Sequence, residues 1–259
     1  MRKIQIIICL LLYLLAACGP KKVAVRYADT YIERQVEKRL PLYETQEAAL
    51  SKDIDKFLNE HKENARSIIP MLDKIDFENP SSLDEQYPKI SEAYLEIAQN
   101  FSAILAKHMS NFDEKQTKDF LKKMRDENNE IFLRDKKERR GKIEARVRSF
   151  LGTLTDKQKQ ILKDHAGEFD QQVVIRSERR ARLHTEFKNI LEQEMSASGK
   201  EKMIYDAFIA YQKEALTGRK NLEIAKEFIP TLTKIQKTNF KTKIMEMQEI
   251  LNYFIETVY

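Results

Sequence analysis

The sequence contains no tryptophan, and only two cysteines, six glycines and six prolines among 259 residues. Two cysteines cannot build a disulfide framework or a four-cysteine zinc site. Few glycines and prolines disfavour a loop-rich β-sandwich and favour long helices. No alternating Val, Ile and Thr run bounded by turn residues occurs, so strands are not expected. What the chain does have is charge of both signs on 34% of its residues, beside 42% hydrophobic residues, which is enough for folding.

The first eighteen residues resemble a bacterial lipoprotein signal. Arg2 and Lys3 precede an apolar segment, 4–15, that is shorter than the roughly 20 residues a membrane-spanning helix needs. This order is typical of a secretory signal peptide. The segment ends in Leu-Ala-Ala-Cys-Gly at 15–19, the order of residues in a lipobox. The resemblance implies cleavage before Cys18 and acylation of its thiol and new amine, palmitate included.

This reading divides the chain into a signal peptide (1–17), a lipidated tether (18–25) and a single all-α domain (26–259), in which 26–78 can form a separate hairpin. Cleavage removes two positive charges, so the net charge falls from +5 to +3. Gly19 is not the aspartate that favours inner-membrane retention, so we expect the outer membrane, with the body facing the periplasm. The membrane, through the lipid anchor, is the predicted partner, together with other envelope proteins.

The body of the chain shows the three-and-four spacing of apolar residues that predicts amphipathic helices. We expect seven or eight of them in an elongated bundle. Pro70 should kink or end one helix, the segment 79–82 should form a turn, and Pro230 should interrupt the last helical stretch. A helix is expected from about 120 to 151, with Gly152 at its C-terminal cap.

A Leu-Thr-x-x-Gln box occurs twice, and two segments, 112–116 and 42–46, are weaker copies of it. The residues of the two clear boxes are Leu154, Thr155 and Gln158, and Leu232, Thr233 and Gln236. At a helix start, the threonine accepts a hydrogen bond from the third backbone N–H and the glutamine reaches back to the capping N–H. A pair of helix caps is therefore the simplest interpretation of the boxes.

The boxes also resemble those of periplasmic chaperones and stress regulators of the Spy/CpxP type. Those proteins carry Leu-Thr-x-x-Gln boxes in a helical cradle, and this chain is similar in box, expected compartment and charge-rich helices. The resemblance implies a chaperone-like role.

The central segment, 120–158, resembles an uncharacterised family of proteobacterial helical lipoproteins, a domain of unknown function. It runs from Phe-Leu-Lys-Lys-Met-Arg-Asp-Glu-Asn-Asn through a charged helix to Phe-Leu-Gly-Thr-Leu-Thr-Asp-Lys-Gln. The likeness covers nearly the whole mature chain and implies an all-α lipoprotein without an established activity. The chain departs from the family in lacking its frequent tryptophans, since Tyr31 and Phe150 stand where aromatic residues are expected.

Two basic runs, 134–148 and 176–182, interleave arginine and lysine with acids. This pattern favours ion pairs along or between helices, as for Glu138 and Lys142, which lie one helical turn apart. The alternative is an anionic surface or an acidic partner; nucleic acid is not expected in the envelope.

The histidines, His61, His108, His165 and His184, show no metal-binding spacing. No phosphate-binding loop or nucleophile elbow occurs either. The sequence therefore predicts no catalytic residue, cofactor, metal or small-molecule substrate. Our first hypothesis is a non-enzymatic, membrane-anchored interaction or chaperone-like protein, and the alternative is a structural tether or assembly factor with one dedicated partner.

Overall fold

The computed structural model describes residues 28–76, 78–133, 136–216 and 220–257. Every regular element in these ranges is helical, which confirms the all-α prediction. The signal peptide, Cys18 and the tether up to residue 25 lie outside the described residues. The elements are α3 (Ala28–Glu37), α4 (Glu44–Glu60), α5 (Lys62–Asp73), α6 (Ser82–Met109), α7 (Glu114–Leu133), α8 (Lys136–Leu151), α9 (Asp156–Asp164), α10 (Ala166–Leu191), α11 (Ala197–Leu216), α12 (Lys220–Phe228), a 3₁₀ turn η1 (Ile229–Thr231) and α13 (Lys234–Thr257).

The prediction of seven or eight helices is wrong, since the described ranges contain eleven α-helices. The extra breaks include two at histidines, and only the second of them has a glycine nearby, Gly167. His61 separates α4 from α5, and His165 separates α9 from α10. The helix expected over 120–151 is two helices, α7 and α8. These breaks depend on tertiary packing, which local propensity does not encode.

Of the two prolines expected to interrupt helices, one does so and the other does not. Pro70 does not end its helix, because α5 continues to Asp73. Packing of buried Leu72 in the main core compensates for the backbone hydrogen bond that a proline removes. Pro230 does interrupt the last stretch, as expected, where η1 separates α12 from α13.

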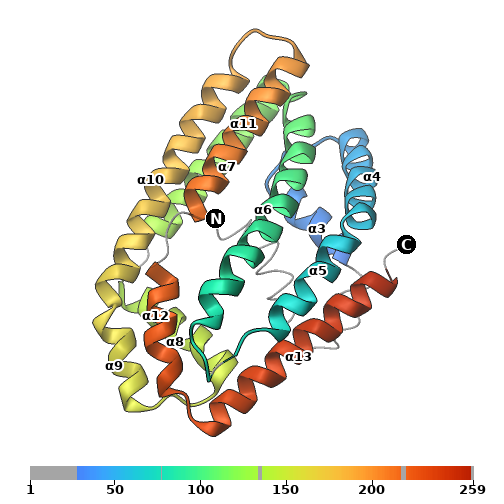
Figure 1. Ribbon diagram of the computed structural model, residues 1–259. Coiled ribbons are helices and arrows are strands. Elements are labelled where there is room, and N and C mark those ends of the chain that lie inside the picture. The colour runs from blue at the N-terminus through green and yellow to red at the C-terminus, as the bar shows by residue number, and fades with distance from the viewer. Residues whose placement is uncertain (1–27, 77, 134–135, 217–219, 258–259) are drawn as a thin grey trace.

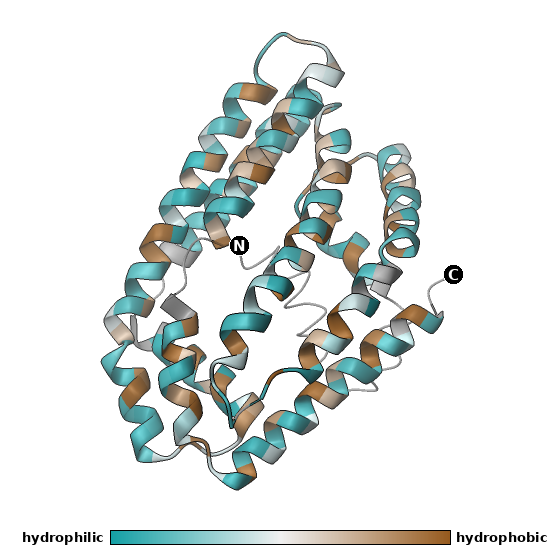
Figure 2. Cartoon of the chain, in the orientation of Figure 1, coloured by the Kyte–Doolittle hydropathy of each residue, from teal (hydrophilic) through white to brown (hydrophobic). Residues whose placement is uncertain are grey.

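The main core lies around α6, which packs against α4, α5 and α11 and runs through the middle of the molecule in Figure 1. Hydrophobic and hydrophilic residues follow one another along the helices (Figure 2), and the buried hydrophobic residues form the packed core between them. Phe187 stands at the centre, with its ring 5.9 Å from that of Phe120 and 4.9 Å from that of Phe208. Each such buried side chain contributes about 1.5–3 kcal/mol, so this cluster holds α7, α10 and α11 together.

A second, smaller core lies where α8, α9, α12 and α13 meet. Its buried residues are Leu151, Leu154, Ile161 and Phe228. Gly152 ends α8 here, as expected, with its N–H donating to Arg148 O at 2.7 Å and a positive φ of 83°. Asn239 Nδ2 lies only 3.0 Å from the place a Cβ would occupy, so a side chain at this positive φ would be strained and would require Asn239 to shift.

No helix within the described ranges is both long enough and apolar enough to cross a bilayer. The longest helix, α6, alternates apolar and polar residues along its length (Figure 2).

Candidate functional site: two pairs of capping boxes

Both clear boxes form the helix caps that the sequence predicts. At the start of α9, Gln158 N donates to Thr155 Oγ1 (3.3 Å), and Thr155 N donates to Gln158 Oε1 (2.9 Å). At the start of α13, Gln236 N donates to Thr233 Oγ1 (3.2 Å), and Thr233 N donates to Gln236 Oε1 (3.0 Å). Each box therefore satisfies two backbone N–H donors at its own helix start.

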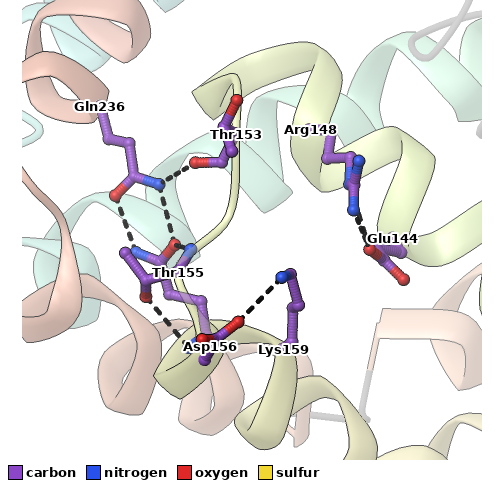
Figure 3. A network of polar contacts seen from close by, with 8 residues as sticks. Glu144, Arg148, Thr153, Thr155, Asp156, Lys159 and Gln236 are labelled. Atoms are coloured by element: carbon purple, nitrogen blue, oxygen red, sulfur yellow. Dashed lines mark hydrogen bonds and ion pairs between the residues drawn. The ribbon is translucent and has the colours of Figure 1, made fainter.

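The two boxes also bind each other, which the sequence did not predict. Gln158 Nε2 donates to Gln236 Oε1 at 2.7 Å, and Gln236 Nε2 donates to Gln158 Oε1 at 2.8 Å. The second proton of each amide goes to a carbonyl two residues before the partner's threonine. Gln158 Nε2 donates to Thr231 O at 3.0 Å, and Gln236 Nε2 donates to Thr153 O at 2.8 Å. Figure 3 shows the Gln236 amide directed at the chain around Thr153 and Thr155.

The paired glutamines are buried, with 0% of Gln158 and 2% of Gln236 exposed. Leu154 is buried in the smaller core beneath them, and Leu232 packs against it. A buried primary amide is costly unless its donors and acceptors are satisfied, and this arrangement satisfies them reciprocally. The pair therefore joins the starts of α9 and α13, which are 78 residues apart at the glutamines.

The two weaker copies form a second pair of the same kind. Tyr43 N donates to Gln46 Oε1 (2.9 Å), and Asp113 N donates to Gln116 Oε1 (3.2 Å). Gln116 Nε2 donates to Gln46 Oε1 and to Pro41 O, both at 2.6 Å. Pro41 again stands two residues before the capping position. This pair joins the starts of α4 and α7 across 70 residues.

The second pair differs from the first in carrying a carboxylate. Asp113 Oδ1 accepts from Gln116 N at 2.8 Å, and its Oδ2 accepts from the Tyr43 hydroxyl at 2.7 Å. The bond from the Gln116 backbone N–H, and then that from the Tyr43 hydroxyl, lower the pKa of Asp113. The same carboxylate raises the pKa of Tyr43. Gln116 is buried (2% exposed) but Gln46 is only half-buried, so this pair is more open to solvent.

The hydrogen bonds of the box residues therefore hold helix starts together. The amides of Gln158 and Gln236 are neutral, and their N–H donors are bonded to partners inside the protein. The sequence located the candidate residues but took each box as a separate cap. The signal that was not used is that the four copies fall into two pairs with similar separation, 70 and 78 residues.

Two of the histidines contact carboxylates, while His184 Nε2 contacts Leu121 O and the His61 ring lies 4.6 Å from that of Phe57. His165 Nε2 lies 2.7 Å from Glu227 Oε2, and this bond raises the pKa of His165. His108 Nε2 lies 2.8 Å from Asp53 Oδ2 and links α6 to α4. Among the residues that the structure describes, no group of three or more His, Cys, Asp or Glu side chains could hold a metal ion.

Residues of the two basic runs pair with acids along and between helices. Lys142 pairs with Glu138, as predicted, and Arg148 Nη2 lies 2.6 Å from Glu144 Oε1 (Figure 3). Between helices, Arg140 Nη2 lies 3.0 Å from Asp170 Oδ2.

Two arginines of the second run, Arg179 and Arg180, are buried rather than solvated, with 6% and 7% exposed. Arg179 Nε lies 3.4 Å from Glu214 Oε1 on α11, and its guanidinium stacks over the Tyr211 ring. Arg180 Nη2 lies 3.5 Å from Glu127 Oε2 on α7. The second basic run therefore serves inter-helix packing.

Comparison with known proteins yields no relative: no family model, no curated protein and no solved structure matches this chain.

Proposed function

We propose that this protein is a lipid-anchored, non-enzymatic interaction module of the bacterial cell envelope with a chaperone-like role. Its start carries the ordered features of a lipoprotein signal ending at Cys18. Its body is a helical frame whose boxes are joined in pairs, which supports the likeness to box-carrying periplasmic chaperones. The uncharacterised lipoprotein family that the central segment resembles fits the same proposal.

The observation that carries the proposal is an exposed, partly apolar face on α13. Ile235 is 74% exposed and Met245 is 60% exposed, and the exposed Thr238 and Thr242 lie between them. The spacing of three, four and three residues places these four side chains on one face of the helix. A single exposed apolar residue is ordinary. Two on one face of a helix, with the methyl groups of two threonines between them, offer apolar surface that another protein can cover.

Suppression of aggregation tests the proposal. Residues 19–259, added at near-stoichiometric ratio to several unfolding clients, should slow the rise of light scattering. The double variant Ile235→Lys, Met245→Lys should lose most of this effect, while Lys118→Ala on the exposed side of α7 should keep it. No effect of the unaltered protein on any client would contradict the chaperone role.

In vivo crosslinking separates the proposal from the alternative of a tether or assembly factor. Many weakly crosslinked clients support the chaperone-like role. One dominant envelope partner would instead support a dedicated tether.

Anchoring is tested at Cys18. Cys18→Ser removes the thiol that carries the first acyl group, so the protein should leave the membrane fraction, since stable anchoring needs more than one chain. Cys9→Ser is the matched control and should not alter partition. Unchanged membrane partition of Cys18→Ser would contradict the lipid anchor.

A further inference from the structure

The two halves of the chain repeat one order of elements. Each half begins with a helix, followed by a capping box and a helix that is broken at a histidine. The chain then turns back along a second long helical stretch and ends with another box and a last helix. In the first half these are α3 to α7, and in the second half α8 to α13. The two boxes of each half are joined to one another, across 70 and 78 residues.

Two stretches of sequence repeat at matching places. The residues that end at the breaking histidine are Phe-Leu-Asn-Glu-His at 57–61 and Ile-Leu-Lys-Asp-His at 161–165. In the returning stretch, Leu-Glu-Ile-Ala-x-x-Phe occurs at 95–101 and again at 222–228. The two stretches follow each other in the same order in both halves. In each half, one apolar side chain from each stretch packs in the core.

Those side chains make equivalent contacts. The ring of Phe57 lies 5.3 Å from that of Phe101, joining α4 to α6. At the matching positions, Ile161 and Phe228 lie together in the smaller core, joining α9 to α12. The repeated sequences therefore mark the same crossing of the outgoing and returning helices in each half.

The halves differ in length at three places. The hairpin between the breaking histidine and the repeated Leu-Glu-Ile-Ala is longer in the second half, 165–222 against 61–95, and the other two differences compensate each other. The outgoing stretch from the box glutamine to the histidine spans 46–61 in the first half and only 158–165 in the second. The returning stretch from the matching phenylalanine to the next capping residue spans 101–113 in the first half and only 228–233 in the second. Since an α-helix has about 3.6 residues per turn, both antiparallel stretches are longer by about two turns in the first half. In both halves, the start of the outgoing stretch and the end of the returning stretch are still joined by the paired boxes.

The contacts between the halves are reciprocal. The last helix of each half packs on the other half's helix that follows the histidine: α7 on α10, and α13 on α5 (Figure 1). The returning helices α6 and α11 pack on each other. Exchange of the same elements in both directions is the property of an interface with twofold symmetry.

A hydrogen bond donated by an amide side chain occurs in both of these contacts between the halves, α7 on α10 and α13 on α5. Asn128 Nδ2, on α7, donates to Ser177 O on α10 at 3.3 Å. Gln248 Nε2, on α13, donates to the Asp73 carboxylate at the end of α5. In each case the last helix of one half donates to the helix that follows the histidine in the other half.

The register of these two bonds is the same. The donors stand equally far from the capping residues of their boxes, because the intervals 113–128 and 233–248 are of equal length. The acceptors stand equally far from the breaking histidines, because the intervals 165–177 and 61–73 are also of equal length. Two amide side chains at equivalent positions therefore reach equivalent positions in the other half.

We propose that the chain consists of two copies of one structural unit, residues 28–133 and 136–257, related by a pseudo-twofold axis through the α6–α11 contact. The surface formed by α5, α6 and α7 is then an interface for a second copy of the same kind of unit, and α10, α11 and α13 supply that copy within one chain. The proposal is independent of client binding, and the molecule is a covalently linked dimer.

Cleavage of the folded full chain at the unit boundary tests this interface. A site-specific protease sequence replaces residues 134–135, and the same sequence replaces the loop 192–196 in a control that cuts inside the second unit. After cleavage, unfolding in urea and removal of urea, the boundary-cut fragments should regain full helicity and elute as one 1:1 complex. The loop-cut fragments should not. Equal recovery of both proteins, or failure of the boundary-cut pair, would overturn the proposal.

Crosslinking tests the reciprocal register. The chain from residue 19 onward has no cysteine, so Asn128→Cys with Ser177→Cys, and Gln248→Cys with Asp73→Cys, can each be joined by a short thiol crosslinker. Both pairs should react to a similar extent, and the mixed control, Asn128→Cys with Asp73→Cys, should not. Reaction of one pair without the other would overturn the equivalence of the two contacts.

Discussion

Each of the two pairs of boxes joins two helix starts, but the residues that form the hydrogen bonds differ between the pairs. In the pair at Gln158 and Gln236, two threonine caps and two buried amides form a closed neutral set of hydrogen bonds. In the pair at Gln46 and Gln116, Asp113 and Tyr43 stand at the positions of the threonines; Asp113 caps its helix, while the Tyr43 hydroxyl donates to Asp113, and one glutamine is half-buried. The comparison shows that the glutamine pair is the common element. The capping residue decides how far the joint depends on pH and solvent.

The largest effect is expected at the buried neutral pair. Gln236→Ala removes both bonds between the two amides and leaves the Thr153 carbonyl and the Thr233 N–H without their side-chain partner in a buried site, so the free energy of unfolding should fall by about 2–4 kcal/mol. Urea unfolding followed by circular dichroism measures the loss. Gln160→Ala, on the exposed side of α9, is the control and should cost less than about 0.5 kcal/mol. If Gln236→Ala lowered the free energy of unfolding no more than Gln160→Ala does, the buried pair would not stabilise the fold as described.

A smaller effect is expected at the more exposed pair. Gln116→Ala removes the bonds to Gln46 and Pro41, but water can reach the half-buried Gln46 amide. The free energy of unfolding should therefore fall by about 1–2 kcal/mol. The same urea measurement ranks the two variants. A loss larger than that of Gln236→Ala would show that exposure does not set the difference between the pairs.

The smallest effect concerns pH. Because the folded state lowers the pKa of Asp113 from the unfolded value of 3.8, its carboxylate stabilises the fold above that value. This stabilisation is lost as the pH falls through the folded pKa. Asp113→Asn keeps a capping oxygen without the charge, so its melting temperature should lie below that of the unaltered protein at pH 7 and approach it at pH 3.

The box at Thr233 supplies the control for this prediction, because it has no titratable cap. Thr233→Ser should show the same offset in melting temperature at pH 7 and pH 3. An offset for Asp113→Asn that does not change with pH would show that the carboxylate charge has no part in the joint.

Helix periodicity and cap chemistry made much of this fold predictable. The caps at Thr155 and Thr233 and the helix end at Gly152 follow from residues within one turn of each other. The pairing of Gln158 with Gln236 could not be predicted in this way, because the two residues are 78 positions apart and neither shows locally what it contacts.

The breaks at His61 and His165 had a signal of another kind. No glycine or proline marks the break at His61, whereas Gly167 is the second residue of α10, directly after the break at His165. The residues before them form one repeated pattern, Phe-Leu-x-Glu-His and Ile-Leu-x-Asp-His. A search for internal repeats would therefore have matched the two breaks to each other. The burial of Arg179 and Arg180 had no such signal, because their partners lie on α7 and α11.

A double-mutant cycle between Gln158 and Gln236 tests most directly that the boxes act in pairs. The free energies of unfolding of Gln158→Ala, Gln236→Ala and the double variant should reveal a coupling of about 1–3 kcal/mol. The control cycle between Gln158 and Gln116, which belong to different pairs, should be additive within about 0.5 kcal/mol. Additive effects of Gln158→Ala and Gln236→Ala would contradict the pairing.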